Sequence, residues 1–110
     1  MEGLVKGDIV VLPFPYSDLT GAKRRPALVA AVLEGEDAIF CLVTSKIRRD
    51  AYSVDLTRDS FACGGLAVES EIRPNRLFTA ESSIVLYKAG TVKSDVISKV
   101  EEMIVSIFTA

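Results

Sequence analysis

Two short basic stretches contain the residues of this chain that could act on a phosphate group. A proline directly follows the first stretch, and two hydroxyl residues begin the second. The stretches comprise Lys23, Arg24 and Arg25, and then Thr44, Ser45, Lys46, Arg48 and Arg49. Because the whole chain carries a net charge of −2, these cations form local basic patches in a slightly acidic protein.

Arginine and hydroxyl side chains together suit the recognition of phosphate. The guanidinium group offers a planar fork of donors and stays charged, and a hydroxyl adds a further donor. The chain has no histidine, and its two cysteines lack metal-ligand spacing, which excludes the usual zinc sites and the Ser-His and Cys-His nucleophiles. We therefore expect neither a metal nor a cofactor. The alternative is a solvated basic face without a ligand.

One reaction at phosphate needs neither a metal nor a protein nucleophile. RNA carries a 2′-hydroxyl group that can attack the neighbouring phosphate once the backbone is oriented and the charge on the non-bridging oxygens is stabilised. Arginine and threonine can supply both contributions. The proton transfers are explained less well, because an arginine that stays protonated is a poor base.

The elements that must position these residues are short strands followed by one helix. Strands are predicted over 8–14, 26–33, 38–44, 53–57, 66–78 and 84–87, with turns at 35–37 and 63–65 and a strand end at 89–90. Loops are predicted over 15–25 and 45–51. From Val96 to Phe108 apolar residues recur at helical spacing, which predicts a helix that begins at an N-cap Ser94 and covers the sheet.

The second and third predicted strands should form a hairpin. If the chain turns near Glu36, Arg25 lies opposite Ile47 and Leu28 lies opposite Thr44, to within about two residues. The two basic stretches then meet at the open end of one hairpin and form a single patch in space.

Length and composition bound the architecture. The 110 residues, 49% hydrophobic and 25% charged, predict a single domain over 1–110 with one core, in which Cys41 is a small core residue. Without a membrane-spanning stretch or a signal peptide, we expect a soluble cytoplasmic protein. We predict a mainly β protein, a small barrel or strongly bent antiparallel sheet with a C-terminal helix packed on it.

Several stretches resemble the MazF/PemK-like toxins of bacterial toxin–antitoxin modules. They are GDIVVLPFPYSDLTGAKRRPALV (7–29), CLVTSK (41–46), GGLAVESEIRPNRLFT (64–79) and the closing amphipathic helix. The most specific parts are GDIV, the Arg-Pro that opens the second strand and the Thr-Ser after the third. The similarity covers nearly the whole chain.

The resemblance implies an SH3-like barrel of the CcdB/PemK type, a homodimer, and an endoribonuclease that a cognate antitoxin protein inhibits. It implies metal-independent, ribosome-independent cleavage of single-stranded RNA at specific sequences, with 2′,3′-cyclic phosphate and 5′-hydroxyl products. Arg25 matches the family's catalytic arginine before proline, and Thr44 matches its catalytic threonine or serine. The PemK branch also uses an arginine and an aspartate two residues later. Arg73 matches the first, but Asn75 replaces the second, which favours Arg25 and Thr44 as the catalytic pair with Arg73 in support.

The remaining candidates are predicted to bind RNA. Lys23 and Arg24 would steer the substrate, and Arg48 and Arg49 would contact backbone phosphates. Tyr16 would offer a surface on which a base can stack. The complete predicted RNA-binding set is Tyr16, Lys23, Arg24, Ser45, Lys46, Arg48, Arg49 and Asn75.

Two other interpretations stay open at this level. The chain could be a non-catalytic toxin of the same fold that binds DNA gyrase, or a degenerate member that binds only its antitoxin. Neither needs the pair of Arg25 and Thr44. At the level of single residues, Thr44 could be a strand-end residue with a satisfied hydroxyl, and Arg73 could lie on an exposed strand face.

Overall fold

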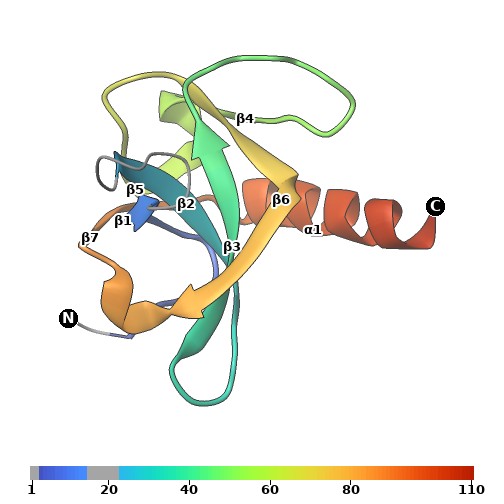
Figure 1. The fold of residues 1–110 in the computed structure, drawn as a ribbon. Helices are drawn as coiled ribbons and strands as arrows, with labels where there is room; N and C mark the ends of the chain where they lie inside the picture. Colours follow the sequence, from blue (N-terminus) through green and yellow to red (C-terminus); the bar gives the residue numbers. More distant parts are fainter. Residues whose placement is uncertain (1–2, 15–22) are drawn as a thin grey trace.

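The described residues form seven strands and a C-terminal helix, in that order along the chain (Figure 1). The computed structural model describes residues 3–14 and 23–110, so the predicted stacking residue Tyr16 lies outside the described part. The strands are β1 (Asp8–Phe14), β2 (Lys23–Val32), β3 (Asp37–Thr44), β4 (Val54–Leu56), β5 (Phe61–Gly64), β6 (Ser70–Glu81) and β7 (Tyr87–Val92). Two 3-10 turns, η2 (Arg58–Ser60) and η3 (Ser82–Ile84), precede β5 and β7, and the helix is α1 (Ser94–Thr109).

The strands form one antiparallel sheet in the order β4-β6-β3-β2-β1-β7-β5. Its two edge strands, β4 and β5, are neighbours in sequence and are joined through η2. The short connection draws the two edges toward each other, so the sheet curls into a nearly closed barrel (Figure 1). The predicted fold class, a small bent barrel with a C-terminal helix, is confirmed.

Apolar residues on both faces of the central strands build the core. Ile9 belongs to a cluster with Val43, Ile72 and the helix residue Val100. Val10, the next residue of β1, belongs to a second cluster on the opposite face of the strand. Burial on both faces explains the continuous apolar runs of β1 and β2. Cys41 is fully buried, as predicted, and burial raises the pKa of its thiol to about 12.

The β2–β3 hairpin is confirmed, but its predicted register is wrong by three residues. Leu28 pairs with Cys41 and not with Thr44. The turn is centred on Gly35, which has φ +79°, and an irregularity between Val29 and Ala31 shifts the ladder by one more residue. Continuing the observed register by two residues places Arg25 opposite Thr44.

The predicted strand over 84–87 is also wrong. Residues 82–84 form η3, and β7 starts only at Tyr87. The predicted strand end at 89–90 lies inside β7, where Gly90 lets β5 approach closely: a Cβ on Gly90 would lie 2.5 Å from the Cys63 carbonyl oxygen. A glycine that looks like a strand end in sequence therefore serves tight strand packing.

The helix lies where the apolar periodicity predicts it. Its N-cap is Lys93 and not Ser94, because the Lys93 carbonyl accepts the first-turn N–H groups of Val96 and Ile97. The N-terminal half buries Val96 and Val100, whereas the C-terminal half extends beyond the barrel in Figure 1. Phe108, part of the predicted apolar stripe, is 75% exposed.

Candidate active site

Arg25 and Thr44 line the same cavity, of about 440 Å³. One wall comes from the first residues of β2 and the end of β3, and the other from the segment before β6. The lining residues are Arg24, Arg25, Pro26, Val43, Thr44, Ser45, Leu66, Ala67, Val68 and Ser70. The predicted meeting of the two basic stretches is thus confirmed, although by a different register from the one expected.

Pro26 and the neighbouring β1 strand hold Arg25 in place. A residue before proline is restricted to extended backbone, and Arg25 is paired with Leu12 of β1. The Arg25 side chain is half-buried, while Arg24 beside it is exposed. Lys23 lies in β2 as its first residue. The two neighbouring arginines therefore differ in exposure: Arg25 is partly enclosed, whereas Arg24 is solvated.

The Thr44 hydroxyl lies at the end of β3 and makes one local contact. Its Oγ1 accepts a hydrogen bond of 3.1 Å from the backbone N–H of Lys46. The hydroxyl proton has no acceptor in the part of the chain that the structure describes, so it can be donated to a phosphate oxygen. Ser45 follows in the same cavity wall and is exposed.

The charges around this cavity are not neutralised by any residue that the structure describes. No carboxylate is among the lining residues. Across residues 3–14 and 23–110, none of the cations Arg24, Arg25, Lys46, Arg48 and Arg49 forms an ion pair. A larger cavity of about 750 Å³ between β4 and α1 is lined by four carboxylates and one lysine, a balance that repels phosphate. The smaller cavity is therefore the candidate site.

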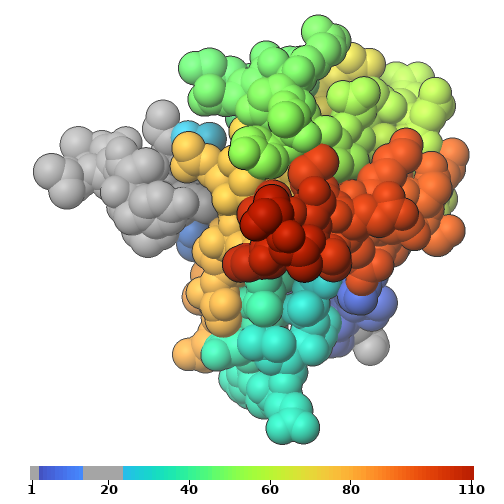
Figure 2. Space-filling view, turned by 90° about the vertical axis from the view of Figure 1, so that its right-hand side faces the viewer, coloured from blue at the N-terminus to red at the C-terminus, as the bar shows by residue number. Residues whose placement is uncertain are grey.

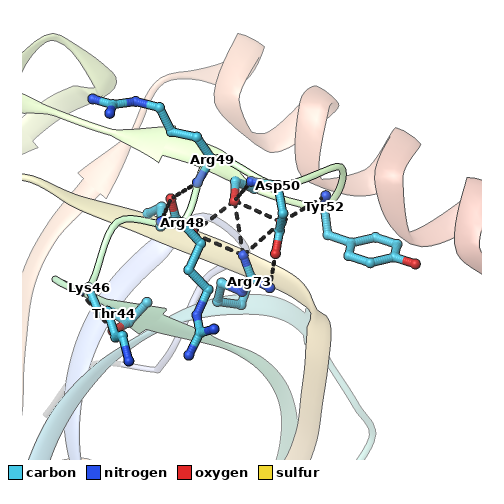
Figure 3. A network of polar contacts seen from close by, with 9 residues as sticks. Thr44, Lys46, Arg48, Arg49, Asp50, Tyr52 and Arg73 are labelled. Carbon is cyan, nitrogen blue, oxygen red and sulfur yellow. Dashed lines mark hydrogen bonds and ion pairs between the residues drawn. The ribbon is translucent and has the colours of Figure 1, made fainter.

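Arg73 is not on an exposed strand face, because its side chain is only 7% exposed. Nη1 donates to Asp50 Oδ1, Ser53 Oγ and Glu71 Oε2, each at 2.9 Å, and Nη2 donates to Asp50 Oδ2 at 2.8 Å (Figure 3). Hydrogen bonds and charge from these carboxylates raise its pKa, with Asp50 contributing most. Whether Arg73 also takes part in catalysis stays a prediction.

Asn75 lies outside the cavity that contains Arg25 and Thr44. Between Cys41 and Leu42 of β3 the pairing with β6 jumps from Leu77 to Arg73, so the three residues between them bulge out of the ladder. Pro74 lies in this bulge, where its missing N–H is tolerated. Asn75 lines a separate cavity of about 390 Å³ with Leu42 and Phe78. The structure therefore does not place Asn75 beside Arg25.

The predicted site omits three polar residues that the structure brings to Arg73. Asp50 and Ser53 lie in the loop before β4, and Glu71 lies in β6 directly across from Thr44. Glu71 and Arg73 flank the buried Ile72, so their opposite charges share the other face of the strand. That spacing was the available signal, and it indicates an ion pair.

The two carboxylates of this network have lowered pKa values. A hydrogen bond from Arg73 lowers the pKa of Asp50, an effect that burial opposes and that hydrogen bonds from Ser53 and the Tyr52 N–H reinforce. For Glu71, burial alone would raise the pKa, but hydrogen bonds from Ser53, from the N–H groups of Arg49 and Arg48 and from Arg73 together lower it. Both groups therefore stay ionised in the folded protein at neutral pH.

Acid should weaken the fold through this network. A carboxyl whose folded pKa is depressed stabilises the protein above its unfolded pKa, and that contribution is lost as the pH falls toward the folded value. The ordinary values are 4.5 for Glu71 and 3.8 for Asp50. We expect the thermal midpoint to fall as the pH drops below about 4.5, and to fall less in Asp50→Asn. Parallel midpoint curves for the two proteins would contradict the assignment.

Two further features bear on the class of protein. Among the residues that the structure covers, no group of three or more cysteine or acidic side chains could hold a metal ion. No helix in the same residues is long and apolar enough to cross a membrane.

A family model and several solved structures match this chain. The model described as "PemK-like, MazF-like toxin of type II toxin-antitoxin system" matches residues 5–108. No curated protein sequence matches significantly. A MazE–MazF crystal structure (Form II) from Deinococcus radiodurans has a TM-score of 0.78 at 21% identity, over 99% of this chain and 98% of that one.

Two mycobacterial structures are similar to the same extent. An endoribonuclease has a TM-score of 0.75 at 12% identity, over 99% of this chain and 94% of that one. An endoribonuclease in complex with its cognate antitoxin has a TM-score of 0.74 at 12% identity, over 99% and 96% of the two chains. At these identities the structures show a shared fold.

Proposed function

This chain belongs to the family of PemK-like, MazF-like toxins of type II toxin–antitoxin systems, and we propose that it is an endoribonuclease that cleaves single-stranded RNA. The observation that carries the proposal is the cavity in which Arg25 and Thr44 lie together, with no carboxylate among the described residues that line it. An RNA backbone supplies the negative charge that this cavity lacks, and its 2′-hydroxyl supplies a nucleophile that the protein then need not provide.

The proposed reaction is a metal-independent transesterification. The 2′-oxygen attacks the adjacent phosphorus, the bond from phosphorus to the 5′-oxygen breaks, the 2′-hydroxyl loses its proton and the 5′-oxygen gains one. The products carry a 2′,3′-cyclic phosphate and a 5′-hydroxyl. Arg25 stabilises the charge that develops on the non-bridging oxygens, and the Thr44 hydroxyl donates to one of them.

The surrounding cations bind the RNA backbone in this proposal. The full set of predicted RNA-binding residues is Lys23, Arg24, Ser45, Lys46, Arg48, Arg49 and Asn75, together with Tyr16, on which a base would stack. Arg24 and residues 45–52 are exposed, and Arg24 and Ser45 line the cavity. Exposed charges of this kind speed association and add sequence-independent affinity. Arg73 supports the pair, and its enclosure by Asp50 and Glu71 favours support from a distance.

The partners follow from the family and from the similar structures. We propose that a cognate antitoxin protein binds and inhibits this chain in the cytoplasm, since similar structures contain MazE or a cognate antitoxin. We also propose that the active form is a homodimer, as the resemblance implies.

A cleavage assay tests the proposed activity. Purified protein is incubated with a long unstructured RNA in EDTA, and we expect discrete fragments whose new 5′ ends accept a kinase label without prior phosphatase treatment. Cleavage that requires an added divalent cation would contradict the mechanism. A protein that leaves every RNA intact under all conditions would refute the activity and leave the gyrase-binding or antitoxin-binding interpretation.

A further inference from the structure

The Glu71 side chain holds the basic loop of residues 45–53 by accepting hydrogen bonds from the backbone of the loop. This side chain is fully buried. Oε1 accepts the N–H of Arg48 at 3.0 Å and the N–H of Arg49 at 3.2 Å, and Oε2 accepts from Ser53 Oγ at 2.8 Å (Figure 3). Two consecutive N–H groups that converge on one anion resemble the backbone nests that bind phosphate. Here the anion is a carboxylate of the protein itself.

Arg73 holds the far end of the same loop. Both of its terminal nitrogens donate to the Asp50 carboxylate, and one of them also donates to Ser53. Such a bidentate pair fixes orientation as well as distance. The Lys46 N–H donates to the neighbouring Thr44. All other hydrogen bonds between the loop and the rest of the described chain involve Glu71 or Arg73.

The conformation that these contacts hold is one that the loop would seldom adopt alone. Arg49 has φ +48°, in the left-handed region that residues with a Cβ disfavour. Arg48 and Arg49 are consequently aimed apart: in Figure 3 the Arg48 side chain lies on the same side as Lys46 and Thr44, whereas Arg49 extends the other way. The buried carboxylate thus holds the backbone from which the Arg48 and Arg49 side chains extend in different directions.

The loop of residues 45–53 projects from the surface of the molecule (Figure 2). In Figure 2 the green segment that contains residues 45–53 stands out as a ridge above the helix. All residues from Ser45 to Tyr52 are exposed, so apolar packing contributes little to their position. The polar anchors therefore determine the loop conformation.

We propose that Glu71 and Arg73 are positioning residues that hold the loop of residues 45–53 ready to bind the RNA backbone, and that neither touches the scissile phosphate. The identity of the ligand rests on the proposed function, whereas the positioning of the loop does not. The Arg73 side chain is only 7% exposed, and both of its terminal nitrogens already donate to Asp50, which leaves little access for a phosphate.

Asp50→Asn gives the cleanest test, because the Asp50 side chain is 39% exposed and the core residues stay intact. We expect KM for RNA cleavage to rise about fivefold with kcat unchanged within about twofold, because the variant weakens binding of the substrate and keeps the contacts made in the transition state. Asp55→Asn is the matched control: it removes an exposed carboxylate of neighbouring β4 and should leave KM unaltered. If Arg73 acts on the phosphate, freeing it from Asp50 changes kcat with little change in KM, and that result overturns the proposal.

Glu71→Gln tests the positioning without reference to RNA. We expect the amide protons of Arg48 and Arg49 to exchange with solvent at least about tenfold faster than in the wild type, as they lose a charged acceptor. Unchanged protection at both amides overturns the proposal even if the protein proves inactive on RNA. Conversely, an RNA-inert wild type with faster exchange in Glu71→Gln refutes the proposed function and supports the positioning of the loop.

Discussion

Arg25→Ala should lower kcat/KM for RNA cleavage by about 100- to 1000-fold, the usual cost of removing one donor that faces developing negative charge. Arg25 is the half-buried cation of the candidate cavity, and its backbone is restrained by Pro26 and by the pairing with Leu12. The loss should appear mainly in kcat, because a positioned donor stabilises the transition state more than the bound substrate. Single-turnover cleavage at saturating enzyme measures it.

The neighbouring arginine provides a matched control. Arg24 precedes Arg25 in the same strand but is exposed, so Arg24→Ala should raise KM by about fivefold and leave kcat nearly unchanged. Arg25→Lys keeps the charge and loses the planar fork, and we expect an intermediate kcat. Equal losses of kcat in Arg24→Ala and Arg25→Ala would show that only total charge matters and would refute a specific role for Arg25.

Gly64→Ala should destabilise the fold by about 2–4 kcal/mol, a loss typical of strain combined with a backbone clash. Gly64 has φ +69°, and a Cβ there would lie 2.3 Å from the Ala89 carbonyl oxygen and 2.6 Å from Gly90 Cα. Strands β5 and β7 approach closely at the pair of Gly64 and Gly90, and neither backbone can move without breaking the ladder. Thermal denaturation should show a midpoint about 10 °C or more below that of the wild type.

The next residue is the control for this substitution. A Cβ on Gly65 would meet no atom within 4 Å, so Gly65→Ala should change stability by less than about 0.5 kcal/mol. The consequence of Gly64→Ala also reaches the site, because β5 leads directly into the segment that supplies Leu66, Ala67 and Val68 to the cavity wall. Similar midpoints for Gly64→Ala and Gly65→Ala would mean that β5 and β7 can separate at little cost.

Local patterns predicted the elements well where one face or one stripe dominates. The strand predicted over 8–14 coincides with β1, and the helical spacing up to Phe108 ends within one residue of the observed helix end. The incorrect prediction of a strand over 84–87 shows the limit of local patterns. Apolar residues followed by Ala-Gly resemble a strand and its end, yet Gly90 lies inside β7, where the neighbouring strand β5 approaches closely. The reason for that glycine lies on another strand, where no local pattern can show it.

The residues of the candidate site were likewise predictable only where local sequence determines their position. A basic stretch before a proline and a Thr-Ser pair after an apolar strand were enough to bring Arg25 and Thr44 to one hairpin end, since a hairpin joins residues that are near in sequence. The role of Arg73 was not accessible in the same way. Its partner Asp50 is 23 residues away, and Asn75, two residues after Arg73, lies in a bulge of β6 that no local pattern shows.

The sequence by itself determined the class of fold, the two basic stretches and the resemblance to a toxin family, because periodicity, proline and adjacent charges act over a few residues. Only the tertiary structure decided that the hairpin turns at Gly35, so that Arg25 faces Thr44. It also decided that Glu71 and Arg73 are enclosed beneath the loop of residues 45–53. Register and burial depend on contacts between distant strands, and a carboxylate's partner is known only once those strands have packed.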